Sequence, residues 1–236
     1  LDGAEFHTPE EGTAQGSILS PLLGNIYLHH AVDVWYEREV KPRMRERSCL
    51  VRYADDLVFG FERRDDAERV MEVLGKRLAR YGLRLAADKT RLLDFRRPPD
   101  DRQGGKGPGT FDFLGFTHYW RRSRKGVWHP AWKTRKKSLR KAIVALQDWC
   151  KTNLHLSIPE QHAALTRRIR GHFNYFGVNG NEKSMSLILY KGERAWIHWL
   201  RRRSQRTRMT WERFNRMLRE MPLPKVRVYR NLWAAP

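Results

Sequence analysis

Residues 51–60 read VRYADDLVFG, with two adjacent aspartates, Asp55 and Asp56, between two short apolar runs. The β-branched and aromatic residues on either side predict two strands at about residues 49–61, joined by a tight link at residues 54–56. Two neighbouring carboxylates repel each other unless a cation neutralises them, and hard cations such as Mg²⁺ prefer carboxylate oxygens. The pattern predicts a hairpin whose tip is either a metal-binding site or a solvated acidic turn.

The net charge of +21 is distributed unevenly along the 236 residues. Residues 1–118 contain 19 Lys and Arg against 20 Asp and Glu, whereas residues 119–236 contain 28 against 6. A polycationic surface of this kind repels itself unless it binds a polyanion, and phosphate contacts drive association by releasing counterions. The second half of the chain is therefore predicted to bind nucleic acid.

Four blocks of the sequence resemble those of a known family. Residues 53–56, YADD, resemble the catalytic signature of reverse transcriptases. Residues 12–28 (GTAQGSILSPLLGNIYL), 82–90 (GLRLAADKT) and 111–116 (FDFLGF) are similar to the blocks around it in group II intron reverse transcriptases. Because all four stand in the family's order and approximate spacing, the chain resembles a group II intron-encoded reverse transcriptase and maturase.

The resemblance implies a role for several residues of the first half. Asp55 would bind both catalytic Mg²⁺ ions of a two-metal polymerase, and Asp56 would shape the field beside it and bind more weakly. Tyr53 would lie near the primer end. Gln15 and Gly16 would line the nucleotide and template pocket, where glycine allows close approach of the backbone.

Two further roles follow from the later blocks. Lys89 matches the position that protonates or neutralises the departing pyrophosphate, and its alternative is an ordinary surface lysine. Phe113, Leu114 and Gly115 match the primer grip; the alternative is a plain buried strand, and the two interpretations are compatible.

Helical spacing and turn residues predict the elements of the first half. A long helix is expected over residues 22–40, ending near Lys41-Pro42. A second helix opens at residues 65–68 and stops at Gly82, with its apolar positions at Val70, Val73, Leu74, Leu78 and Tyr81. Strands are expected at residues 83–95 and 111–120, separated by a Pro- and Gly-rich loop.

The second half becomes helical from about residue 130. Leu139, Ile143, Leu146 and Trp149 share one helix face, a further helix starts at Pro159, and a third covers residues 187–200. The resulting fold class is α+β. The resemblance implies a partial reverse-transcriptase palm, an antiparallel sheet with helices, over residues 1–120. It also implies an all-α basic thumb or maturase domain over residues 121–236.

Two arginine groups are predicted to bind RNA. Residues 167–176, RRIRGHFNYF, resemble the Arg-Gly-x-x-x-Tyr-Phe signature of that maturase domain and supply Arg167, Arg168 and Arg170. A second run, Arg201, Arg202 and Arg203, is either a solvated helix end or a set of phosphate contacts.

One departure from the family concerns the metal site. A two-metal polymerase needs another aspartate, which in this family precedes the Gln15-Gly16 block by several dozen residues, and only fourteen residues precede Gln15 here. The chain is therefore expected to be a C-terminal fragment or one piece of a split enzyme, inactive without a separate N-terminal fragment. A carboxylate outside this chain would complete its Mg²⁺ site.

The expected partners are group II intron RNA, an RNA/DNA primer–template and deoxynucleotides, in a bacterial-type cytoplasm. One alternative is a non-catalytic RNA-binding splicing factor, which the absent upstream aspartate favours and the intact Asp55-Asp56 pair opposes. Another is a retron or defence-type reverse transcriptase, which the Arg170-Gly171 block and the large basic region disfavour.

Cysteines and apolar runs limit other classes of function. Cys49 and Cys150 cannot form a zinc cluster by themselves and are expected to be buried free thiols. The histidines pair with no cysteine or carboxylate at a metal-ligand spacing. No uninterrupted apolar run approaches the roughly 18 residues of a membrane helix, so no membrane partner is expected.

Overall fold

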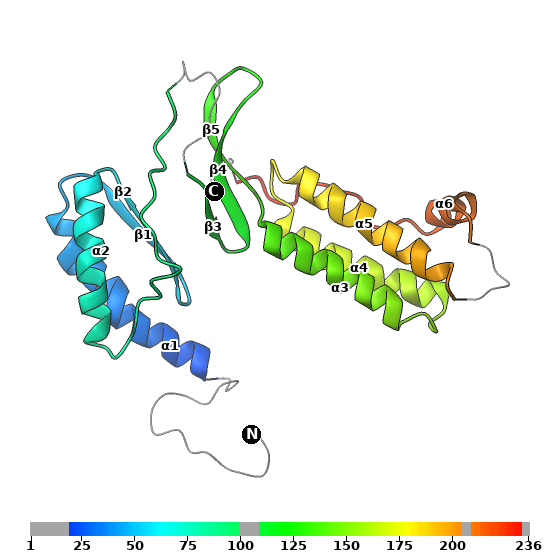
Figure 1. The fold of residues 1–236 in the computed structure, drawn as a ribbon, viewed down its shortest axis with the longest axis horizontal. Coiled ribbons are helices and arrows are strands. Elements are labelled where there is room, and N and C mark those ends of the chain that lie inside the picture. The colour runs from blue at the N-terminus through cyan, green and yellow to red at the C-terminus, as the bar shows by residue number, and fades with distance from the viewer. Residues whose placement is uncertain (1–18, 100–108, 204–208, 233–236) are drawn as a thin grey trace, which may run out of the picture. The chain divides into compact units, whose positions relative to one another are not determined.

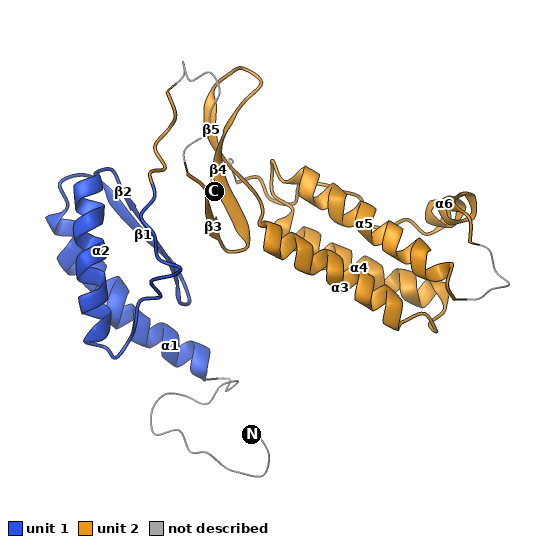
Figure 2. Cartoon of the chain, in the orientation of Figure 1, with its two compact units in different colours: residues 1–93 blue, residues 94–236 orange. Residues whose placement is uncertain are grey.

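The computed structural model describes residues 19–99, 109–203 and 209–232 (Figure 1). The chain divides into two compact units, residues 1–93 and residues 94–236 (Figure 2). They are called unit 1 and unit 2 below. Each has its own cluster of buried apolar side chains.

The described part of unit 1 begins with a continuous helical segment. It comprises α1 (Ser20–Leu28), the wider π turns η1 (His29–Asp33) and η2 (Tyr36–Val40), and the short 3₁₀ turn η3 (Lys41–Arg43). The predicted helix and its end near Lys41-Pro42 are confirmed, whereas the π turns carried no sequence signal. Such turns inside helices are uncommon and often occur at functional sites.

A hairpin and a helix complete unit 1. Strands β1 (Ser48–Tyr53) and β2 (Asp56–Phe61) pair antiparallel, as predicted, and α2 (Arg64–Ala79) follows. The core of the unit joins Val32, Trp35 and Tyr36 of the helical segment to Leu74 and Leu78 of α2. The inner side chains of the hairpin pack against this core. Val73, expected on the buried face of α2, is exposed.

The strand predicted at residues 83–95 is wrong. After α2 the chain turns at Gly82, whose φ of +66° suits glycine. It then continues without a strand, and the amides of Lys89 and Thr90 both donate to the Ala86 carbonyl. Leu83 and Leu85 pack against the core, so the alternation in sequence reflects side-chain burial without a hydrogen-bonded ladder.

Unit 2 begins with an antiparallel sheet in the order β3-β4-β5. Its strands are β3 (Phe111–Phe113), β4 (Phe116–Arg122) and β5 (Trp128–Thr134). The single strand predicted at residues 111–120 is therefore two strands. The predicted start of the helical region at residue 130 is also wrong, because Pro130 lies within β5 and pairs with Trp120. An edge strand tolerates a proline that cannot donate to a ladder.

Four helices follow the sheet in the described residues of unit 2: α3 (Lys136–Thr152), α4 (Ile158–Phe176), α5 (Glu182–Leu200) and α6 (Trp211–Glu220). The first three were predicted, and α6 was not. Ser157 and Glu160 form a capping box at the start of α4, with Pro159 in its first turn. The helices bury Leu165, Ile169, Phe173, Ile188 and Trp196.

Asn181 fastens the sheet of unit 2 to its helices. Its buried side chain accepts from the Thr134 amide at 2.9 Å and donates to the Thr134 hydroxyl at 2.9 Å and to the Phe176 carbonyl at 2.8 Å. The C-terminal segment closes the same region, because the amides of Tyr229 and Arg230 donate to the Gly177 carbonyl. The sheet and helices therefore form one unit, while the palm and thumb assignments of residues 1–120 and 121–236 stay predictions.

Two remaining expectations concern cysteines and membrane helices. Cys150 is buried, and burial raises the pKa of its thiol to about 12. Cys49 is exposed, so the expectation that it is buried is wrong, because its side chain lies on the outer face of β1. Within the part of the chain that the structure describes, no helix is long and apolar enough to cross a membrane.

Candidate functional site

The tip of the β1–β2 hairpin is a two-residue turn formed by Ala54 and Asp55. Tyr53 and Asp56 are the last paired residues of the ladder. Ala54 has φ of +53°, the left-handed region that such turns require at this position and that glycine usually occupies. Both carboxylates, of Asp55 and Asp56, are exposed. The strained turn therefore holds two carboxylates at its tip, where hydrated ions and ligands can reach them.

Arg52 braces this turn against the helical segment. Its Nε and Nη2 donate to the two carboxylate oxygens of Asp33 at 2.8 and 2.7 Å. Its Nη1 donates to the side-chain oxygen of Asn25 at 2.8 Å and to the carbonyl of Ala54 at 3.2 Å. One guanidinium thus connects α1, the π turn η1 and the residue that precedes Asp55.

The ion pair between Arg52 and Asp33 is largely shielded from water. The two side chains keep 14% and 27% of their surface exposed. The hydrogen bonds from Arg52 are the main cause that lowers the pKa of the Asp33 carboxyl, and burial partly opposes them. The same contact raises the pKa of Arg52. A bidentate pair of this kind is rigid, so it fixes the direction in which the turn leaves the strand.

The donor set at the tip suits a hard divalent cation. Asp55 and Asp56 offer carboxylate oxygens, the ligands that Mg²⁺ prefers, and water can occupy the remaining positions of its octahedral shell. Among residues 19–99, 109–203 and 209–232, no group of three or more His, Cys, Asp and Glu side chains gathers as a metal site. Asp33 is engaged by Arg52 and His29 and so adds no free carboxylate to the tip.

The sequence also predicted roles for Tyr53, Lys89 and the Gln15-Gly16 pair. Tyr53 is 65% exposed, beside the two aspartates at the end of β1. Lys89 is exposed in the turn that follows α2, and within the described residues it forms no ion pair or hydrogen bond with Asp55 or Asp56. Gln15 and Gly16 lie outside the described residues.

The predicted primer grip is the turn between β3 and β4. Leu114 and Gly115 have φ of +48° and +79°, which suits a two-residue hairpin turn, with Phe113 paired to Phe116. The Gly115 carbonyl accepts from the Arg135 amide at 2.8 Å. A Cβ on Gly115 would lie 3.3 Å from the Phe176 ring, so the turn is closely packed. Leu114 and Gly115 therefore form a turn between two strands, and the primer-grip role stays a prediction.

Two separate sequence blocks meet at this turn. Tyr175 of the RRIRGHFNYF block donates its hydroxyl to the Leu114 carbonyl at 2.9 Å. The Phe116 ring lies 6.0 Å from the Tyr175 ring and 5.1 Å from the Phe176 ring. The aromatic end of the maturase-like signature therefore holds the primer-grip-like turn in place.

The two predicted arginine groups occupy different helices. Arg167, Arg168 and Arg170 are exposed on α4, where Arg168 lies 4.8 Å from the centre of the Trp149 ring. Arg201, Arg202 and Arg203 are exposed where α5 ends. Arg201 donates to the Met209 carbonyl at 2.8 Å and lies over Trp211, and Arg202 lies over Trp199. The guanidinium groups of Arg168, Arg201 and Arg202 therefore lie over aromatic rings, on residues that are exposed to solvent.

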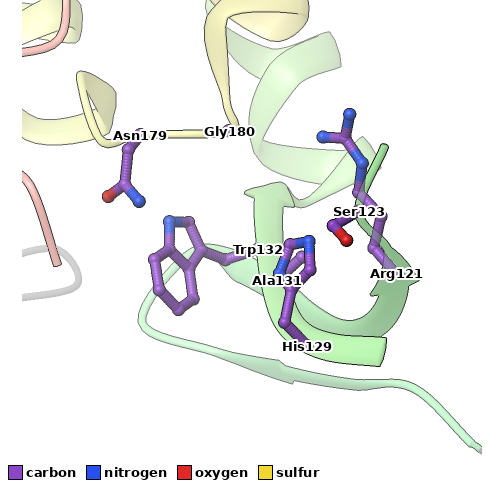
Figure 3. A pocket seen from close by; sticks show the side chains of 7 residues that line it. All are labelled: Arg121, Ser123, His129, Ala131, Trp132, Asn179 and Gly180. Atoms are coloured by element: carbon purple, nitrogen blue, oxygen red, sulfur yellow. The ribbon is translucent and has the colours of Figure 1, made fainter. Parts of the chain in front are cut away.

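A small pocket on the sheet of unit 2 was not predicted. It has a volume of about 240 Å³ and is bounded by β4, β5 and the loop before α5. Figure 3 shows the seven residues that line it, among them Arg121, His129, Trp132 and Asn179. Two of its polar groups already have partners, because His129 contacts the Pro130 carbonyl and Asn179 accepts from the Leu232 amide.

Arg52 was also missed, although the sequence held a signal for it. It shares the inner face of β1 with Ser48 and Leu50, while Val51 and Tyr53 point outward. A charged residue at an inward position of an amphipathic strand indicates a shielded ion pair, because an unpaired charge there would be costly.

Comparison with known proteins agrees with these observations. The family described as reverse transcriptase (RNA-dependent DNA polymerase) matches residues 2–118. The group II intron-encoded protein LtrA of Lactococcus lactis subsp. cremoris is 29% identical over 111 residues, as is its counterpart from strain MG1363. Each alignment covers 43% of this chain and only 18% of the relative. On the strength of its YADD hairpin, the blocks around it and these matches, the chain belongs to the reverse transcriptases of the group II intron-encoded type.

Proposed function

We propose that this chain supplies the metal-binding hairpin, the primer grip and the RNA-binding helices of an intron-encoded reverse transcriptase and maturase. The observation that carries the proposal is the turn at Ala54 and Asp55, which presents two exposed carboxylates and is braced from inside by Arg52. A turn serving only to connect two strands would need neither the strained alanine nor the repelling pair.

Asp55 and Asp56 would hold Mg²⁺ in this proposal. When bound, Mg²⁺ supplies activation of an attacking hydroxyl and stabilisation of a leaving oxygen. The described residues contribute no third carboxylate to the tip, so we propose that a carboxylate from outside them completes the site. Arg52 acts as a positioning residue, because it fixes the carbonyl that precedes Asp55 without reaching the exposed tip. Lys89 is proposed to neutralise the departing pyrophosphate once substrates are bound.

The remaining groups would position nucleic acid. The Leu114–Gly115 turn, held by Tyr175, offers close-packed backbone to the primer strand. Tyr53, Gln15 and Gly16 are proposed to lie along the nucleotide and template pocket. The exposed arginines of α4 and of the end of α5 would bind phosphates of structured intron RNA.

Primer extension tests the polymerase part of this proposal. The chain is mixed with an RNA template, a DNA primer, deoxynucleotides and Mg²⁺, either alone or with a fragment carrying the upstream part of a related intron reverse transcriptase. We expect extension only from the mixture, because one missing bridging carboxylate and unaligned nucleotides each remove a large part of the catalysis.

The Asp55→Asn variant is the decisive control. The amide matches the carboxylate in size and removes only its charge, so the mixture should lose extension. If the mixture extends the primer equally well with Asp55→Asn, the hairpin is not the catalytic centre. If the chain alone extends the primer and Asp55→Asn stops it, a carboxylate within the chain completes the site.

A non-catalytic RNA-binding splicing factor is the second candidate. The observation that favours it is that the described residues place no third carboxylate near Asp55 and Asp56. It predicts RNA binding and assisted intron splicing by a mixture that never extends a primer, whatever upstream fragment is supplied.

A further inference from the structure

A larger pocket lies in unit 2, against helices α3, α5 and α6. Its volume is about 500 Å³. Cationic and aromatic side chains dominate its lining, namely Lys151, Lys191, Arg194, His198, Trp199 and Trp211. Only Arg201, at one end of this lining, belongs to the arginine groups that the sequence indicated. We refer to this site as the α3–α5 pocket.

The positive charge of the α3–α5 pocket is not neutralised within the described part of the chain. Lys151, Lys191 and Arg194 form no ion pair with any described residue, and Asp148 is the single acidic side chain among the residues that line the pocket. Several like charges around one hollow raise its electrostatic potential and concentrate anions there. The lining therefore suits the phosphates of a polyanion.

The two tryptophans of the pocket have different surroundings. Trp199 packs against the helical core, with Lys151 and Arg202 over its ring at 5.9 and 5.3 Å. Trp211 keeps 40% of its surface exposed. Phe214 meets Trp211 edge to face at 5.8 Å, and Arg201 lies 5.8 Å from its centre. Trp211 is thus a fixed aromatic ring with free surface beside unneutralised cations.

We propose that the α3–α5 pocket binds an unpaired nucleotide of RNA, with its base stacked on Trp211 and its flanking phosphates at Lys191 and Arg194. The inference rests on the proposed RNA-binding function and adds which kind of RNA element is bound. In an A-form duplex the base faces are hidden by their neighbours, so an aromatic ring can stack only on a base from a loop, bulge or end. A pocket that offered only Lys and Arg side chains would bind the phosphates of a duplex and of a loop equally well.

The test compares two RNAs with the full 236-residue chain. One is a hairpin with an unpaired purine loop, and the other is a fully paired duplex with the same number of phosphates. We expect Trp211→Leu to weaken binding of the hairpin by about tenfold, the usual effect of losing one base–aromatic stack, and to leave duplex binding unchanged. Trp211→Phe, which keeps a ring, should retain most of the affinity.

Two controls separate stacking from charge. Trp128→Leu is the matched control, because Trp128 also lies beside an arginine, Arg122 at 5.0 Å, but on the sheet and away from the pocket lining. It should change neither affinity. Lys191→Gln with Arg194→Gln should reduce the logarithmic salt slope by up to about two for both RNAs, because phosphate contacts do not depend on pairing.

Equal weakening of both RNAs by Trp211→Leu, or no weakening of either, overturns the inference while leaving RNA binding in place. If that variant does not fold, 2-aminopurine in the loop gives a second measurement on the unchanged chain, since stacking on tryptophan quenches its fluorescence. Unquenched fluorescence in the bound complex overturns the inference. If the unchanged chain shows no salt-dependent RNA binding, the proposed RNA-binding function fails and this inference fails with it.

Discussion

Several arginines of unit 1 pair with carboxylates, although Arg77 lies over Tyr81, whereas several arginines of unit 2 lie over aromatic rings. In unit 1 Arg47 pairs with Glu62, Arg52 with Asp33 and Arg64 with Glu68. In unit 2 Arg168 lies over Trp149, Arg202 over Trp199 and Arg227 over Tyr229. A carboxylate neutralises a guanidinium, but an aromatic ring leaves its charge intact.

This difference separates two tasks. In unit 1 the Arg52–Asp33 pair braces the backbone that precedes Asp55, and carboxylates neutralise several other arginines. Arginines that lie over rings in unit 2 are held in position and keep a positive charge that the ring does not neutralise. Both properties favour binding of a polyanion. The comparison predicts that changes in the two units affect catalysis and RNA affinity separately.

The largest expected effect concerns Asp55. In the mixture with an upstream fragment, Asp55→Asn should lower the rate of primer extension by at least about 10²–10³-fold, the scale of losing one group that stabilises transition-state charge. The dissociation constant for RNA should stay the same, because unit 2 is unaltered. Primer extension and filter binding on the same preparations give both numbers, and a matching loss of RNA affinity would break the separation.

The arginine run at the end of α5 should affect RNA binding and leave the catalytic hairpin unaltered. Replacing Arg201, Arg202 and Arg203 by Ala should flatten the logarithmic salt slope of RNA binding by up to about three units if all three contact phosphates. The matched control replaces Arg45, Arg47 and Arg63, which are also exposed but pair with Asp65 and Glu62. Their charges are neutralised, so the control should keep the slope. An equal change in both triple variants would show that only net charge matters.

Arg52 tests the bracing within unit 1. Arg52→Lys keeps the charge but cannot donate to Asp33, Asn25 and Ala54 together, so we expect a loss of about 1–3 kcal/mol in the free energy of unfolding. Denaturant unfolding of the full chain measures it. Primer extension by the mixture should fall as well, with the Mg²⁺ dependence moved to higher concentration.

Arg47→Lys is the companion variant for Arg52. Its pair with Glu62 is exposed on the arginine side, so the substitution should leave stability and extension unchanged. If Arg52→Lys behaves in the same way, the shielded ion pair does not position the turn.

The smallest effect concerns the pH dependence of stability in unit 2. Burial lowers the pKa of His172 from 6.5 to about 4. At a pH between these two values, the imidazole is therefore protonated in the unfolded chain and neutral in the folded chain. Stability is therefore complete above pH 6.5 and declines as the pH falls towards 4. Thermal unfolding of wild type and His172→Gln between pH 4 and 7 measures the difference.

The Asp33 carboxyl of unit 1 affects stability in a lower pH range than His172 does. Its pKa is lowered from 3.8, so its contribution is present above 3.8 and is lost only as the pH falls below that value. Unit 2 should weaken first on acidification. An identical pH dependence in His172→Gln and wild type would exclude His172 as the cause.

Local patterns predicted much of the fold. The hairpin at residues 48–61 and the helices α2 to α5 follow from periodicity, caps and turn residues, all of which act over a few positions. The misses involve partners distant in sequence. Pro130 indicated the start of a helical region but lies in an edge strand paired with β4. Residues 83–95 alternate like a strand, yet their alternation comes from packing Leu83 and Leu85 on the core.

The candidate site shows the same limit. YADD indicated the two carboxylates directly, because their neighbours in sequence identify the hairpin. The brace from Arg52 to Asp33 spans 19 residues, and the contact of Tyr175 with Leu114 spans 61. Neither pairing has a local pattern, so only the folded chain reveals that two predicted blocks share one structural turn. The π turn that carries Asp33 also had no signature in the sequence.

The closing segment of unit 2 has a consequence for the order of folding during synthesis. Tyr229 and Arg230 bond to the Gly177 carbonyl, and the Leu232 amide bonds to Asn179 across 53 residues. A ribosome adds about 5–20 residues per second, so the loop between α4 and α5 is synthesised several seconds before these partners. During that interval the carbonyl of Gly177 must be solvated. Nascent unit 2 should therefore stay sensitive to proteases until residue 232 has emerged, whereas unit 1 should become resistant much earlier.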